Sequence, residues 1–141
     1  MSGKLKYSLL TRDLIWNAIA TSFANGVIRG FSGVQVAETV TDPGVAKCIE
    51  FTKNGGIFVP GETSNGFNFG TSASGIILSD GEIYSGEGLA VAQLSWFRLY
   101  NNNLTKWIQG SASISNAVMT VTSTSIEIGT PVAINSFQFN F

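Results

Sequence analysis

The sequence predicts a mainly β protein: an antiparallel β-sandwich or jelly-roll-like domain that carries one N-terminal α-helix. Three observations support this fold class. After Gly26, short runs rich in Val, Ile, Thr and Phe alternate with clusters of Gly, Asn, Ser and Asp, the pattern of strands and turns. The 16 glycines suit tight antiparallel connections. One segment alone has the period of an amphipathic helix, so parallel βαβ units are not expected.

The helix is expected over residues 8–25, after an N-terminal arm of residues 1–7. Its apolar residues form two adjacent i, i+4, i+8 rows: Leu10, Leu14 and Ala18, and then Ile15, Ile19 and Phe23. Ser8 can cap the N-terminus, and Asn25-Gly26 tolerates the left-handed geometry that ends helices. Because the two rows adjoin, they predict one broad apolar face that lies against the edge or face of a sheet.

Strands are expected wherever an apolar run is bounded by turn residues. The candidate strands are residues 27–32, 45–52, 57–59, 66–69, 75–78, 82–85, 89–100, 105–114, 118–122, 125–128 and 132–140. Turn signals such as Asp42-Pro43-Gly44 and Asn54-Gly55-Gly56 separate them. Residues 94–100 carry large side chains on both alternating faces, which predicts a central strand covered on both sides. At this length we expect a single domain over residues 8–141.

The composition disfavours catalysis. The chain of 141 residues has no histidine and one cysteine, and 12% of its residues are charged while 44% are hydrophobic. Without histidine a Ser-His-Asp mechanism is excluded, and the side chains that hold transition metals are scarce. We therefore expect a protein that is not an enzyme and that uses no cofactor, no metal and no small-molecule substrate.

The charge balance limits the partners further. The formal net charge is −1, so there is no basic excess to neutralise phosphates, and nucleic acid is not an expected partner. No segment approaches the roughly 18 apolar residues of a membrane-spanning helix. Arg12, Asp13 and Asn17 interrupt the apolar residues near the N-terminus, so we expect neither a signal peptide nor a membrane partner.

The acidic residues and the single cysteine each have a simple structural explanation. Asp80, Glu82 and Glu87 come nearest to a carboxylate pair or a calcium site. However, Asp80-Gly81-Glu82 is better explained as a hairpin turn with one solvated glutamate. Cys48 has no partner for a disulfide and is expected to be a small hydrophobic core residue instead of a reactive thiol.

The aromatic residues leave a second function class open. Trp96 and Trp107, with Tyr84 and Tyr100, could form a platform on which sugar rings stack. The chain would then be a carbohydrate-binding β-sandwich module. In a sandwich most such aromatic side chains belong to the core, so this function is the alternative and not the first choice.

Two short segments are candidates for contacts with another subunit. The candidate contact residues are Lys4, Leu5, Lys6, Tyr7, Phe139 and Phe141. The first four form an arm that could reach across to a neighbour, the alternative being a solvated, mobile terminus. Phe139 and Phe141 share a strand face with Phe137, and this face either docks in the chain's own core or engages a partner.

Several blocks of the sequence, in their order, resemble a family of small structural proteins from tailed bacteriophages. The blocks are Ser2-Gly3-Lys4-Leu5-Lys6-Tyr7-Ser8, Val27-Ile28-Arg29-Gly30-Phe31-Ser32-Gly33, Ser95-Trp96-Phe97-Arg98-Leu99-Tyr100-Asn101, Ile108-Gln109-Gly110, Thr124-Ser125-Ile126-Glu127-Ile128-Gly129 and Ile134-Asn135-Ser136-Phe137. The resemblance covers nearly the whole chain. It departs at Val34-Gln35-Val36-Ala37, where a Gln-Pro pair would be expected, and over residues 54–75.

The resemblance implies a virion component without catalytic residues. Within the virion it suggests a capsid decoration, or cement, protein: a minor capsid protein that binds the major capsid protein as a homotrimer. The alternative position is the tail or the head–tail junction. The implied location is the virion, after synthesis in the cytoplasm of the host bacterium.

Overall fold

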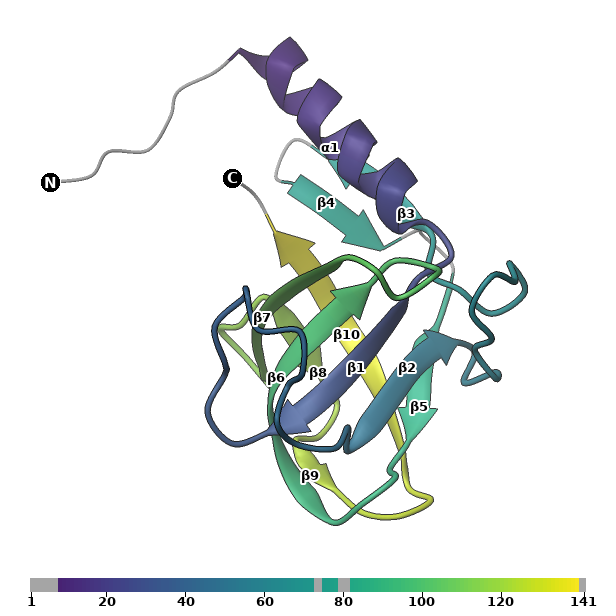
Figure 1. Cartoon of the computed structure of the whole chain (residues 1–141), viewed down its shortest axis with the longest axis vertical. Helices are drawn as coiled ribbons and strands as arrows, with labels where there is room; N and C mark the ends of the chain where they lie inside the picture. The colour runs from purple at the N-terminus through teal and green to yellow at the C-terminus, as the bar shows by residue number, and fades with distance from the viewer. Residues whose placement is uncertain (1–7, 73–74, 79–81, 140–141) are drawn as a thin grey trace, which may run out of the picture.

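The computed structural model describes residues 8–72, 75–78 and 82–139 of the chain. Within these residues there are one helix and ten strands (Figure 1). They are α1 (Leu9–Phe23), β1 (Val27–Ser32), β2 (Ile49–Lys53), β3 (Phe69–Ser72), β4 (Gly75–Leu78), β5 (Tyr84–Glu87), β6 (Ala92–Tyr100), β7 (Trp107–Ser113), β8 (Met119–Val121), β9 (Ser125–Ile126) and β10 (Pro131–Phe139). The prediction of a mainly β protein with one N-terminal helix is therefore confirmed.

Seven of the strands close into a barrel, in the order β10-β5-β2-β1-β6-β7-β8, with β8 pairing back to β10. The expectation of two packed sheets, as in a sandwich or jelly roll, is therefore wrong: the strands form one closed sheet. Closure depends on the length of β10, which pairs with β5 through residues 131–133 and with β8 through residues 134–137. The parallel pair β7–β8 completes the circuit, and a closed sheet has no free edges along this path.

Large apolar side chains fill the barrel. Phe51, Phe97 and Leu99 are fully buried, and the ring of Phe97 meets the ring of Phe137 edge to face at 5.4 Å between centroids. Cys48 is buried in the same cluster as predicted, and burial raises the pKa of its thiol. This continuous cluster is the main source of folding free energy in the domain.

Strand β6 is covered on both sides, as predicted from its sequence. Phe97 and Leu99 point into the barrel core. Trp96, Arg98 and Tyr100 are also buried, although they point to the outer wall. Their cover is the long connection between β1 and β2, residues 33–48, which we call the strap (Figure 1).

The helix and the β3–β4 hairpin lie together beyond one end of the barrel (Figure 1). The last residues of β10, Gln138 and Phe139, leave the barrel and pair with β4. The hairpin thus extends the sheet past the barrel, and α1 lies against it. This arrangement gives the molecule two parts, a closed barrel and a smaller helix–hairpin unit.

Several stretches of the expected strands are loops instead, among them residues 45–48, 57–59, 66–68 and 89–91. Residues 45–48 belong to the strap, and β2 begins only at Ile49. Residues 57–59 form no strand, and Ile57 is 81% exposed in a loop that Asn65 closes by donating to the Ile57 carbonyl at 2.8 Å. At residues 57–59 the apolar run is too short to gain a neighbouring strand, so local side-chain hydrogen bonds determine the backbone.

Candidate functional site

The predicted contact residues fall mainly outside the region that can be described. Lys4, Leu5, Lys6 and Tyr7 precede the described residues, and Phe141 follows them. The backbone of Phe139 pairs with Ile76 of β4, whereas its side chain is not described. Phe137, on the same strand, is buried in the barrel core. The predicted role of these residues in contacts with another subunit therefore remains a prediction.

The helix begins and ends where the sequence predicted. The Ser8 hydroxyl accepts a hydrogen bond from the Thr11 backbone N–H at 3.2 Å, and so caps the N-terminus. Asn25 has a φ of 61°, the left-handed geometry that turns the chain from α1 into β1. Between these ends the helix is rotated about its axis so that Trp16 and Phe23, on one side, are buried.

That rotation separates the two apolar rows that the sequence placed on one face. Phe23 is 7% exposed, and Ile15 and Ile19 are half-buried. Leu10 and Leu14, by contrast, are 78% and 71% exposed. We call the row Leu10, Leu14 and Ala18 the outer helix row; nothing in the described part of the chain covers it. The prediction of a single broad buried face is wrong: the helix buries Trp16, which is 1% exposed and belongs to neither predicted row, together with Phe23.

Arg98 is the side chain that holds the strap on the barrel. It is fully buried, and its guanidinium donates to the carbonyls of Thr41 at 2.9 Å and Val40 at 2.5 Å, and to the Gln109 side chain at 3.0 Å. Among the described residues no carboxylate forms an ion pair with Arg98. Its charge is stabilised by carbonyl dipoles and by the ring of Trp107, whose centroid lies 4.8 Å from the guanidinium carbon.

Other side chains of β6 and β7 bind the strap in the same way. Each donates to a backbone carbonyl of the strap: Ser95 to Gly33, Gln109 to Val36 and Trp107 to Glu38. A long connection without its own strands has unsatisfied carbonyls, and these donors satisfy them. The strap is therefore a fixed part of the outer wall. One feature of the sequence indicates it, namely an arginine in a strand that carries no other charge.

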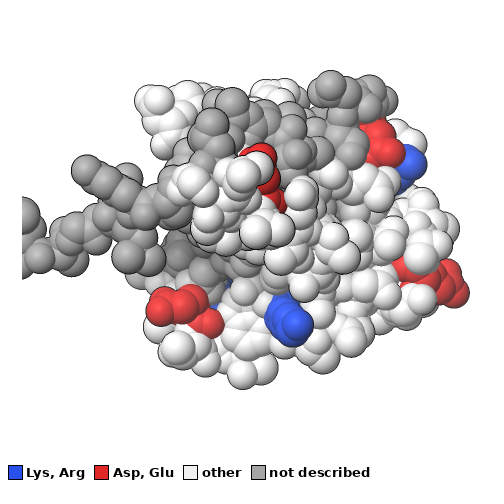
Figure 2. Space-filling model, turned by 90° about the horizontal axis from the view of Figure 1, so that it is seen from above, with Lys and Arg blue, Asp and Glu red and all other residues white. Residues whose placement is uncertain are grey.

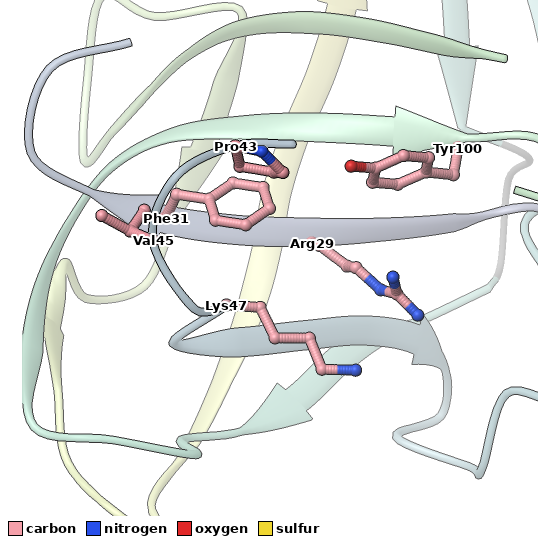
Figure 3. Close-up of a pocket in the computed structure, with 6 residues that line it drawn as sticks. All are labelled: Arg29, Phe31, Pro43, Val45, Lys47 and Tyr100. Carbon is pink, nitrogen blue, oxygen red and sulfur yellow. The ribbon is translucent and has the colours of Figure 1, made fainter. Parts of the chain in front are cut away.

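Under one half of the strap lies a hollow of about 190 Å³ (Figure 3). It is lined by Arg29, Phe31, Pro43, Val45, Lys47 and Tyr100. The charged ends of Arg29 and Lys47 lie toward one end, and Phe31 and Val45 lie toward the other (Figure 3). Glu50 accepts from both cations through one oxygen, at 2.9 Å from Arg29 and 2.8 Å from Lys47. The hollow is thus cationic at one end and apolar at the other.

The carboxylates that the sequence singled out do not form a catalytic pair. Asp80 lies outside the described residues, and Glu87 is exposed at the end of β5. Glu82 accepts hydrogen bonds from Tyr84 and from Asn68, and pairs with Lys53 at 3.0 Å. We call these four residues the junction cluster.

The hydrogen bonds of the junction cluster keep Glu82 ionised, and they do not prepare it for proton transfer. The hydrogen bond from Tyr84 is the main cause that holds the pKa of Glu82 below its usual value, while partial burial opposes it. Burial and the neighbouring carboxylate raise the pKa of Tyr84 above its usual value. Glu82 therefore stays ionised and Tyr84 stays protonated near neutral pH, as in a structural link. No group of three or more potential metal ligands occurs among the described residues.

The four candidate sugar-stacking aromatics are mostly buried. Trp96, Tyr84 and Tyr100 are at most 7% exposed, and Trp96 stacks on Phe31 at 4.6 Å. Trp107 is half-buried and forms part of a second hollow of about 330 Å³, with Glu38, Thr105 and Lys106. The structure therefore does not present these four rings as one platform.

Comparisons with known proteins add no relative to this description. No protein-family model matches the chain. Neither a curated protein nor a solved structure matches it. The helix that the structure describes is also too short and too polar to cross a membrane.

Proposed function

We propose that this chain is a non-enzymatic structural protein of a tailed-bacteriophage virion. Within that class, the proposal is a decoration protein that binds the major capsid protein as a homotrimer. The main observation in its favour is the outer helix row, an apolar surface that no described part of the chain covers. The order of sequence blocks that resembles phage structural proteins supplies the biological setting.

Exposure of the outer helix row has an energetic consequence. Burying a leucine side chain stabilises a structure by about 1.5–3 kcal/mol relative to leaving it in water. Leu10 and Leu14 are both more than two-thirds exposed and lie one helical turn apart. Two neighbouring leucines on a helix form the kind of anchor that a facing helix or groove buries. Association through this row is therefore favourable, whereas the isolated chain gains nothing from it.

The charge distribution favours close packing of copies. Figure 2 shows the molecule from the side of the helix, and most described atoms on this face belong to uncharged residues. The net charge of the whole chain is only −1, so copies repel one another weakly. A closed symmetric oligomer would repeat the same contact in every subunit, and multivalent attachment to a shell would strengthen it further.

The composition of purified phage particles tests this proposal. We expect the chain to co-purify with particles through a density gradient and to be found by quantitative mass spectrometry. A decoration protein predicts a copy number of the same order as the major capsid protein. A few copies per particle would replace the capsid position by the tail or head–tail junction. Absence of the chain from particles that contain all other structural proteins would refute the virion assignment.

A further inference from the structure

The hollow under the strap combines cationic and apolar side chains, and self-association through the outer helix row does not involve them. It lies on the outer wall of the barrel, between β1, the end of β6 and the second half of the strap. We propose that it binds an acidic sugar residue, such as a hexuronate unit of a glycan. The carboxylate would lie at the cationic end, and the C–H face of the pyranose ring would lie against the apolar end.

The cationic end retains capacity for an anion. Arg29 and Lys47 carry two positive charges, and Glu50 supplies one negative charge between them. Glu50 occupies the Nε–H of Arg29, and in the described part of the chain no other side-chain or backbone acceptor bonds this guanidinium. The two terminal NH₂ groups are therefore available to a carboxylate, which an arginine can bind through two parallel hydrogen bonds.

The guanidinium is held in place for such a contact. Its central carbon lies 5.4 Å from the centre of the Tyr100 ring, and its Nε–H is bonded to Glu50 at 2.9 Å. Both contacts restrict the rotation of a long side chain before a ligand arrives. Preorganisation of this kind lowers the entropy that binding costs.

The apolar end and the volume of the hollow indicate the rest of the ligand, namely the ring that carries the carboxylate. Phe31, Val45 and Pro43 line the hollow away from the charged ends of Arg29 and Lys47, and the ring of Tyr100 lines it beside Arg29 (Figure 3). A sugar ring presents a C–H face that packs on such surfaces while its hydroxyl groups remain in water. The volume of about 190 Å³ lies below the roughly 300–1,000 Å³ of pockets for drug-sized ligands, so the hollow suits a single ring.

Titration of the full chain with simple glycosides, followed by ¹H–¹⁵N NMR, tests the proposal. We expect methyl β-glucuronide to shift the amide signals of Arg29, Lys47 and Tyr100 in a saturable way. Methyl β-glucoside, which lacks the carboxylate, should bind at least tenfold more weakly. Acetate, which lacks the ring, should also bind at least tenfold more weakly, which separates an acidic sugar from a general anion.

Two substitutions and a matched control locate the site. Lys47→Gln should weaken glucuronide binding about tenfold, because one charge-assisted hydrogen bond is lost. Glu50→Gln should tighten it, because the competing carboxylate is removed from both cations. Lys106→Gln removes the same charge beside the second hollow and should leave the affinity unchanged.

The amide spectrum of each variant shows whether it folds as the wild type does. Equal binding of glucuronide, glucoside and acetate would overturn the proposal. So would shifts confined to other residues, or no saturable shift in the wild type. These outcomes do not depend on the oligomeric state or on the presence of the chain in virions.

Discussion

The outer wall of the barrel and the outer face of the helix both carry large side chains that point away from the barrel core, but only those on the barrel wall are covered by another described segment. On the barrel, Trp96 and Arg98 point outward from β6, and the strap covers both of them. On the helix, Leu10 and Leu14 point outward, and no described segment covers them. The described residues therefore cover the large side chains on the barrel wall and leave those on the helix uncovered.

This difference separates residues that fold the protein from residues available to a partner. The strap is held by side-chain donors from β6 and β7 to five of its carbonyls, so the barrel wall is covered within a single chain. The outer helix row has no such complement. Substitutions under the strap should reduce the stability of the monomer, and substitutions in the outer helix row should not.

The largest loss of stability is expected for a substitution in the barrel core, and the losses at the barrel wall and at the helix are compared with it. Phe97→Ala removes a fully buried ring that contacts Phe137 at 5.4 Å between centroids. The resulting cavity should lower the free energy of unfolding by about 3–5 kcal/mol. Chemical denaturation followed by circular dichroism measures this change. A loss below about 1 kcal/mol would mean that the described core does not hold the fold together.

Arg98→Met tests the covered wall. It removes the donors to Thr41, Val40 and Gln109 while it keeps much of the side-chain volume. We expect a loss of about 2–3 kcal/mol, on the order of one to two hydrogen bonds from a charged group, and faster proteolysis within the strap. Lys106→Met, at an exposed cation, is the control and should change neither quantity. An unaltered strap in Arg98→Met would show that Arg98 does not hold it.

The junction cluster between barrel and hairpin should give a pH-dependent effect. The pKa of Glu82 is lowered from its ordinary value of 4.5 in the folded chain, so the unfolded chain binds the proton more readily. The stabilisation is complete above pH 4.5 and is lost as the pH falls through the folded pKa. Denaturation at several pH values should show a steeper acid loss for the wild type than for Glu82→Gln. Parallel curves for the two proteins would contradict the assignment.

The smallest effect on stability is expected in the outer helix row. Leu14→Gln replaces a side chain that is 71% exposed, and glutamine forms helices about as well as leucine. The free energy of unfolding of the monomer should change by no more than about 0.5 kcal/mol. Thermal denaturation at low protein concentration measures it, with Phe23→Gln, on the covered side of the same helix, as the destabilising counterpart. A large loss in Leu14→Gln would mean that the row packs within the chain.

Local sequence rules predicted the elements well where the local signal was strong. The strand bounds of β1 and β4 and both ends of α1 follow from turn residues, caps and alternation that act over a few positions. Closure of the sheet was not predictable in this way. It depends on residues 134–137 of β10 meeting β8, a non-local pairing that no local pattern encodes.

The candidate sites were less predictable than the fold. Arg98 was visible as a charge in an apolar strand, but its partners are backbone carbonyls nearly 60 positions away, which have no side-chain signature. Likewise, Arg29 reaches the local Lys47–Glu50 pair only because the β1–β2 register places Arg29 opposite Glu50. The helical period identified both apolar rows, but it did not single out Trp16, which belongs to neither row and is 1% exposed.

The central claim is that the outer helix row is a contact surface between chains. Sedimentation equilibrium of the wild type and of the double variant Leu10→Gln/Leu14→Gln tests it most directly. We expect the wild type to form a defined oligomer, a trimer in the specific proposal, and the variant to be a folded monomer. A wild type that remains monomeric at every concentration, or a variant that assembles as the wild type does, would contradict it.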